Sequence, residues 1–162
     1  MTDHDATESA AATAPAIGRV ALPFPAGDPP TREVPIHAVR LGCTVAFDPS
    51  AGVGTGKVRF SELTFSRPVD SASPRLLMAT ASGQALDGVS VHLFRSGTTD
   101  VATRYQLHDV RVTGVEVHAG AATDGQAVET VSLQFRRVEM SYRDVNGTQI
   151  DVGWDLQDNV PM

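Results

Sequence analysis

The sequence has only one cysteine, Cys43, and only one lysine, Lys57, among its 162 residues. A single cysteine excludes an internal disulfide and a cysteine-rich metal site, and its strand-like flanks, GCTVAF, indicate a thiol that packs as a small hydrophobe. The 19 Asp and Glu residues outnumber the 13 Lys and Arg residues, which gives a net charge of −6. Because non-specific nucleic-acid binding requires clustered cations, we predict no nucleic-acid partner.

Long apolar runs are also missing, most clearly in the first 16 residues, MTDHDATESAAATAPA. This segment carries Asp3, Asp5 and Glu8 and no Lys or Arg, whereas a cleavable signal peptide requires basic residues followed by an apolar run. Its small and polar side chains cannot form a core. We therefore expect residues 1–16 to be a disordered tail, residues 17–162 to form one domain, and neither to insert into a membrane.

The chain lacks the motifs of common enzymes and cofactor sites. The run GVGTGKV at residues 52–58 resembles a phosphate-binding loop, but Ala51 stands where the first glycine belongs and Val58 replaces the magnesium-binding Ser or Thr. No GxSxG, HExxH or calcium-loop pattern occurs. The histidines show no metal-binding spacing; those outside the tail are His37, His92, His108 and His118. We predict a protein that is not an enzyme and has no catalytic residues, cofactor or metal.

From residue 17 onward the pattern is that of β-structure. Apolar residues recur at spacing two between Gly, Asp, Asn and Pro residues. In three places the alternation changes phase, which predicts a bulge or bend within a long strand. The three changes fall between Phe60 and Leu63, between Leu107 and Val110, and between Phe135 and Val138. Asn146 and Gly147 predict a hairpin that pairs residues 139–145 with residues 148–156.

One helix is predicted, in the run SASPRLLMATASG. Ser73 is suited to cap its first turn, Pro74 fits that turn, and Gly83 can end the helix in the left-handed conformation. So short a helix must pack against a sheet. Its predicted core face is Leu76, Leu77 and Met78, of which we expect at least two to be buried.

Three further runs, GKVRFSELTFSRPVDSASPRLLMATASG, VETVSLQFRRVEMSY and IDVGWDLQDN, together resemble the Hcp tube-protein family of type VI secretion systems. The resemblance covers about residues 54–162. It implies a mainly β fold, a small two-sheet β-barrel with one short α-helix packed at its side. It also implies a family related to contractile phage tail-tube proteins, with no catalytic residues to carry over.

The resemblance further implies a ring of six identical subunits, with rings that stack into the inner tube of a contractile injection machine. By position, the ring-stacking loop would comprise Asp48, Pro49, Ser50, Gly52, Gly54 and Gly56. Its partners would be further copies of itself and the sheath, spike or effector proteins of the same machine. Before assembly the protein would be located in the bacterial cytoplasm, and it would be exported through the machine without a signal peptide.

Two other hypotheses remain open from the residues alone. The first is a monomeric β-barrel that binds a peptide or a small ligand, and the second is a secreted enzyme of unknown chemistry. Strands with few central charges, such as residues 128–135, are predicted to be good ring partners, since open β-edges invite association. The mass of the protein in solution distinguishes the ring from the monomer.

Overall fold

The computed structural model describes residues 15–24, 31–46, 50, 56–120 and 125–162. Residues 1–14 of the predicted tail lie outside this part of the chain. The elements are β1 (Gly18–Pro23), β2 (Thr31–Ile36), β3 (Ala38–Arg40), β4 (Cys43–Thr44), β5 (Arg59–Phe60), β6 (Leu63–Pro68), α1 (Ser73–Ser82), β7 (Ala85–Leu86), β8 (Val89–Phe94), β9 (Val101–His108), β10 (Val110–His118), β11 (Val128–Gln134), β12 (Arg137–Arg143), β13 (Gln149–Asp155) and β14 (Val160–Pro161).

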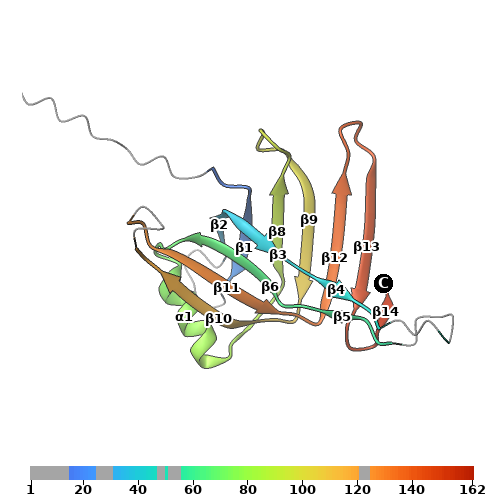
Figure 1. Ribbon diagram of the computed structural model, residues 1–162, viewed down its shortest axis with the longest axis horizontal. Helices are drawn as coiled ribbons and strands as arrows, with labels where there is room; N and C mark the ends of the chain where they lie inside the picture. Colours follow the sequence, from blue (N-terminus) through green and yellow to red (C-terminus); the bar gives the residue numbers. More distant parts are fainter. Residues whose placement is uncertain (1–14, 25–30, 47–49, 51–55, 121–124) are drawn as a thin grey trace, which may run out of the picture.

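The strands form two main sheets (Figure 1). The larger has seven strands in the order β14-β13-β12-β9-β8-β1-β2, and the smaller has five in the order β3-β6-β11-β10-β7. Strands β4 and β5 form a separate two-stranded ribbon. The predicted fold class, mainly β with two sheets and one short helix, is therefore confirmed. Within the described residues the hydrogen-bonded ladders do not close, so the barrel is open.

The phase changes in the sequence mark places where one strand ends and the chain enters another sheet. Strand β9 ends at His108 in the larger sheet, and β10 begins at Val110 in the smaller one. The residue between them, Asp109, has φ 54°, an unusual value for a non-glycine residue. Strands β11 and β12 change sheets in the same way. At these two positions the phase change is a corner between the two main sheets, so a bulge within one continuous strand is wrong and a bend of the chain is what occurs. The third phase change, between Phe60 and Leu63, is where the chain leaves the β4–β5 ribbon and enters the smaller sheet.

The hairpin at Asn146 and Gly147 is confirmed. Strand β12 pairs with β13 from Arg137 opposite Asp155 to Arg143 opposite Gln149. The Gly147 N–H donates to the Asp144 carbonyl, and Gly147 has φ 87°. The Asp144 carboxylate accepts hydrogen bonds from the backbone N–H groups of Asn146 and Thr148. Glycine is suited to this turn because it has no Cβ to oppose a positive φ.

Helix α1 packs on strand β10 with a narrower apolar face than the sequence predicted. Leu76 and Ala79 are buried, together with Ala72 just before the helix. Leu77 and Met78 are 59% and 64% exposed, so the expectation of at least two buried residues among the three is wrong. Each residue turns the helix by about 100°, so residues three or four apart share a face whereas consecutive ones do not.

The ends of the helix follow the prediction only in part. Gly83 ends the helix with φ 64°, as expected. Ser73 is the first helical residue, and the capping position before it is Ala72, which makes no side-chain cap. The Ser73 hydroxyl instead accepts a hydrogen bond from the Asp70 N–H and donates one to Glu129. Ser73 therefore joins the helix start to strand β11.

Candidate assembly surface

The core side of the larger sheet extends beyond the part that the smaller sheet covers. Near the corner, Leu107 and Val138 are opposite each other and buried. Further along the same strands, Met140 is half-buried and lies opposite Val152 on β13, which is 60% exposed. Ile150 is 61% exposed on the same face. We call the set of Tyr105, Met140, Tyr142, Ile150 and Val152 the uncovered face.

A short arm borders this face. It is the β4–β5 ribbon, in which Cys43 pairs with Phe60. The ribbon crosses the β12–β13 hairpin at the end opposite its turn (Figure 1). Between the arm and the larger sheet lies a groove of about 360 Å³. The groove is lined by Leu41, Gly42, Cys43 and Phe60 from the side of the arm, and by Tyr105, Val138, Met140, Val152, Gly153 and Trp154 from the sheet. The uncovered face therefore continues into an apolar groove.

Cys43 lies in a strand as expected, but its thiol is exposed. The prediction of a thiol packed as a small hydrophobe is therefore wrong. Cys43 lines the groove between the arm and the larger sheet, which leaves its side chain accessible. Trp154 is half-buried, because one part of its side chain packs against the core and another part lines the groove.

The predicted ring-stacking loop, residues 48–56, lies in the sequence between β4 and β5. Asp48, Pro49, Gly52 and Gly54 lie outside the described residues, whereas Ser50 and Gly56 are described. Gly56 packs closely on Ala46, since a Cβ placed on Gly56 would lie 2.7 Å from the Ala46 Cβ. The Val58 N–H donates to the Asn159 side-chain oxygen at 3.1 Å. The base of the loop is thus narrow and fixed to the turn before β14.

Strand β13 has an open edge beside the uncovered face. Strand β14 pairs with it only at Trp154 and Asp155, and among the described residues no strand pairs with the edge from Gln149 to Val152. By contrast, β11 is paired on both sides, by β6 and by β10. The prediction that residues 128–135 offer an edge to a ring partner is therefore wrong, because both edges of that strand are used within the chain.

The histidines are dispersed over the described part of the chain, which contains no cluster of three or more His, Cys, Asp or Glu side chains able to hold a metal. His108 contacts Glu139 at 2.9 Å, and Asp109 contacts Arg137 at 3.5 Å, so His108 and its neighbour Asp109 have separate partners. Within this described part of the chain, no helix is long and apolar enough to cross a membrane.

A buried ion pair is the main feature that the sequence analysis missed. Arg67 and Glu129 are opposite each other on β6 and β11, are both 0% exposed, and contact each other at 2.5 Å. Arg67 also contacts Asp70 at 2.5 Å. Burial acts to raise the pKa of Asp70, but hydrogen bonds from Arg67 and the Ala72 N–H, with the charges of Arg67 and Arg32, hold it below its usual value. The only sequence signal is a charged residue at an inward position of each strand.

Comparisons with known proteins give the same fold. The family model described as "Type VI secretion system effector, Hcp" matches residues 30–142. Protein hcp1 of Pseudomonas aeruginosa is 26% identical over 112 residues, which cover 64% of this chain and 68% of that protein.

Two solved structures show the same architecture. Hcp1 from Salmonella typhimurium has a TM-score of 0.72 at 24% identity, over 90% of this chain and 99% of that one. A type VI secretion system effector from Yersinia pestis has a TM-score of 0.68 at 17% identity, over 85% of this chain and 98% of that one. The family model spans more than half of the sequence, and the chain therefore belongs to the Hcp family, the structural tube proteins of type VI secretion systems.

Proposed function

We propose that six copies of this chain close into a ring, and that such rings stack into the inner tube of a contractile injection machine. In this role the protein is structural and non-catalytic. Before assembly the copies reside in the bacterial cytoplasm, and they leave through the machine itself. Sheath, spike or effector proteins of the same machine are the proposed partners.

The observation that carries the proposal is the uncovered face. Ile150 and Val152 are more than half exposed although they continue an apolar row that begins in the core. A contiguous exposed apolar surface typically marks a protein interface. The open edge of β13 beside it offers unpaired backbone groups to a neighbour. A second copy that covers both satisfies the apolar side chains and the strand edge together.

A closed ring requires a second contact surface on each subunit in addition to the uncovered face. Cyclic assembly uses two different patches on each subunit, and each patch contacts the other type on the next copy. The uncovered face would supply one patch. We further propose that the arm, with its loop at residues 48–56, projects from the ring and contacts the next ring.

The alternative hypothesis, a monomeric binding module, is favoured by one observation, the groove of about 360 Å³. That volume lies within the usual range for small-ligand pockets. The groove opens onto the uncovered face, however, so a copy that covers this face would also close the groove. The two hypotheses therefore predict different masses in solution.

Light scattering coupled to size exclusion distinguishes them. Six chains of 17.1 kDa give a ring of about 103 kDa. We expect that mass at tens of micromolar protein, and ring-shaped particles in electron micrographs of the same fraction. A mass of one chain under these conditions, at low and at physiological salt, would reject the ring and support the binding module.

A further inference from the structure

The other side of the larger sheet carries a row of cations. Register places Arg104 on β9 opposite His92 on β8, and His92 opposite Arg19 on β1. On the other side of β9, Arg104 is opposite Ser141. Successive strand residues point to opposite faces, so this row faces away from the core and from Tyr105.

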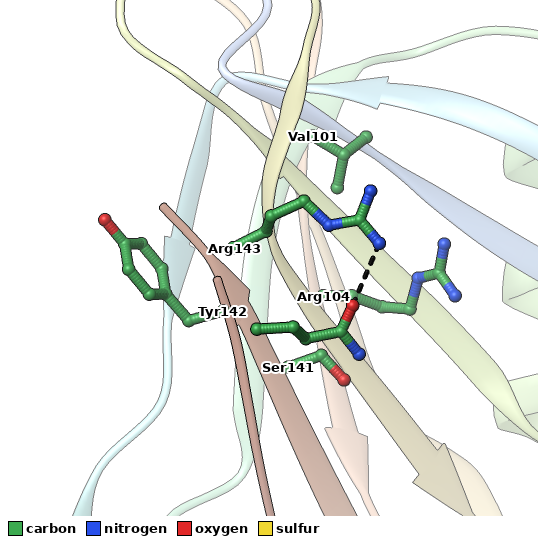
Figure 2. A pocket seen from close by; sticks show the side chains of 6 residues that line it. Val101, Arg104, Ser141, Tyr142 and Arg143 are labelled. Atoms are coloured by element: carbon green, nitrogen blue, oxygen red, sulfur yellow. Dashed lines mark hydrogen bonds between the residues drawn. The ribbon is translucent and has the colours of Figure 1, made fainter. Parts of the chain in front are cut away.

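A hollow of about 140 Å³ lies in this surface. Its lining residues come from β9, β12 and β13, and they are Val101, Arg104, Ser141, Tyr142, Arg143 and Gln149. Figure 2 shows the guanidinium groups of Arg104 and Arg143 on one side of the sheet, while the ring of Tyr142 points to the other. We call Arg104 and Arg143, with the hollow between them, the arginine face.

The two arginines lack acidic partners among the described residues. Neither has a carboxylate oxygen within 4.0 Å, whereas Arg19 contacts Glu33 at 3.5 Å. Arg143 donates to the neutral side-chain oxygen of Gln149 at 2.9 Å. A third guanidinium, that of Arg95, donates to the Arg143 carbonyl at 2.8 Å. This part of the surface therefore holds several positive charges, and the Asp151 carboxylate offsets only part of the charge of Arg143.

The lowered pKa of His92 is consistent with an excess of positive charge at this surface. Burial lowers the pKa of His92, the charges of Arg104 and Arg19 lower it further, and only Glu33 acts to raise it. Hydrogen bonds from Ser141 and Gln149, with a smaller contribution from the charge of Arg143, lower the pKa of the nearby exposed carboxylate of Asp151, the one described acid that interacts with the arginine face. An additional anion would be favourable at this face.

We propose that the N-terminal segment of this protein, residues 1–14, docks on the arginine face through its carboxylates. The segment carries Asp3, Asp5 and Glu8 and no Lys or Arg, so its charge is opposite to that of the arginine face. A guanidinium group donates two parallel hydrogen bonds to a carboxylate, so exposed arginines with no carboxylate oxygen within 4.0 Å are suited to bind such a segment.

The position where the described chain begins brings the segment within reach. The Ile17 carbonyl accepts a hydrogen bond from the Phe94 N–H at 2.9 Å, so the chain enters beside β8. Strand β9 is the second neighbour of β1 and β12 is the third, which corresponds to about 10 and 14 Å across the sheet. The nine residues from Glu8 to Ile17 can span up to about 30 Å. The reach of these residues therefore exceeds the distance from β1 to β9 and β12.

Docking by exposed charges has a direct consequence for the arginine face. While the segment is bound, another acidic ligand must displace it to reach Arg104 and Arg143. Because such contacts are screened by salt, the docking is strongest at low ionic strength. The proposal rests on charge and geometry within one chain, so it can hold or fail independently of the proposed ring.

Zero-length carbodiimide cross-linking of the full chain tests the proposal, because it joins a carboxylate to a primary amine only when the two groups touch. The variants R104K and R143K each place an amine on the arginine face. The control R111K places one at an exposed arginine on β10 in the other sheet, and the natural Lys57 is an internal control. Linked peptides are identified by mass spectrometry at about 0.01 M and about 1 M salt, where the Debye length falls from about 30 Å to about 3 Å.

We expect the amines at positions 104 and 143 to link to Asp3, Asp5 or Glu8 at least about fivefold more than the amine at 111 or Lys57 at low salt, and the excess to disappear at high salt. A link between Asp151 and the amine of R143K shows that this amine reacts. The proposal is overturned if that link forms without any link to the N-terminal segment, or if the segment links equally to all four positions.

Discussion

The helix end and the β12–β13 hairpin end of this molecule differ in how far their apolar side chains are covered. At the helix end, α1 packs on β10, and the smaller sheet covers the core side of β1, β2 and β8, so the apolar side chains between these layers, such as Leu22, Ile36 and Leu76, are fully buried. At the hairpin end, β12 and β13 extend past that cover (Figure 1). Ile150 and Val152 stay exposed there. The difference teaches that one end is completed within the chain, while the other becomes complete only when another copy covers it.

The helix end also contains the buried charges, which makes it the more sensitive to single substitutions. Replacing Glu129 with Ala leaves the Arg67 guanidinium buried, with Asp70 as its only carboxylate partner among the described residues. Breaking such a pair from one side costs about 3 kcal/mol or more. We expect this loss in the free energy of unfolding, measured with urea at a fixed protein concentration. The matched control is E139A, which removes an exposed glutamate paired with His108 and should cost less than about 1 kcal/mol. Equal costs for E129A and E139A would show that the buried pair is not a special feature of this end.

The second prediction concerns the helix itself. L76A removes a fully buried side chain and should lower the free energy of unfolding by about 2–5 kcal/mol. L77A removes a neighbouring leucine that is 59% exposed and should change it by less than about 0.5 kcal/mol. Urea unfolding of the two variants compares them directly. Similar losses would mean that Leu77 is covered in the assembled protein, and the helix end would then also be an assembly surface.

The smallest expected effect is the pH dependence that Asp70 contributes. Its pKa is lowered in the folded state, so its charge stabilises the fold above the unfolded pKa of about 3.9, and this stabilisation is lost as the pH falls through the lower folded value. D70N keeps an oxygen that can accept from the Ala72 N–H but removes the charge. Because Asp70 is 37% exposed, we expect a loss of less than about 1 kcal/mol at pH 6. The difference in stability between the wild type and D70N should shrink as the pH falls below about 3.9, the unfolded pKa, and a difference that stays constant as the pH falls further would contradict the assignment.

Much of the fold could be predicted because its signals are local. Alternating apolar residues indicated the strands, and Gly147 and Gly83 marked a turn and a helix end where a positive φ is required. The runs that resemble the Hcp family also indicated the two sheets and the single helix. The wrong predictions have one common cause. The side of the helix that is buried, and the change of sheet at Asp109, depend on how distant segments pack.

The candidate surface was less predictable from sequence. Ile150, Val152 and Tyr142 look like ordinary core residues of alternating strands, and only the arrangement of the sheets shows that nothing in the described chain covers them. The pairing of Arg67 with Glu129 likewise joins residues 62 positions apart. The low charge of residues 128–135 favours a ring contact, but charge alone does not reveal that both edges of β11 are paired within the chain.

The central claim is that another copy covers the uncovered face, and a matched pair of variants tests it most directly. V152D and V117D each place a carboxylate at a strand valine, with 60% and 59% exposure respectively, but only Val152 belongs to the uncovered face. Burying that charge in an interface without a partner is costly, whereas an exposed charge on β10 is not. Light scattering coupled to size exclusion should give about 103 kDa for the wild type and V117D, as for six chains of 17.1 kDa, and the mass of one chain for V152D. A ring that persists in V152D, or one that dissociates equally in both variants, would contradict the account.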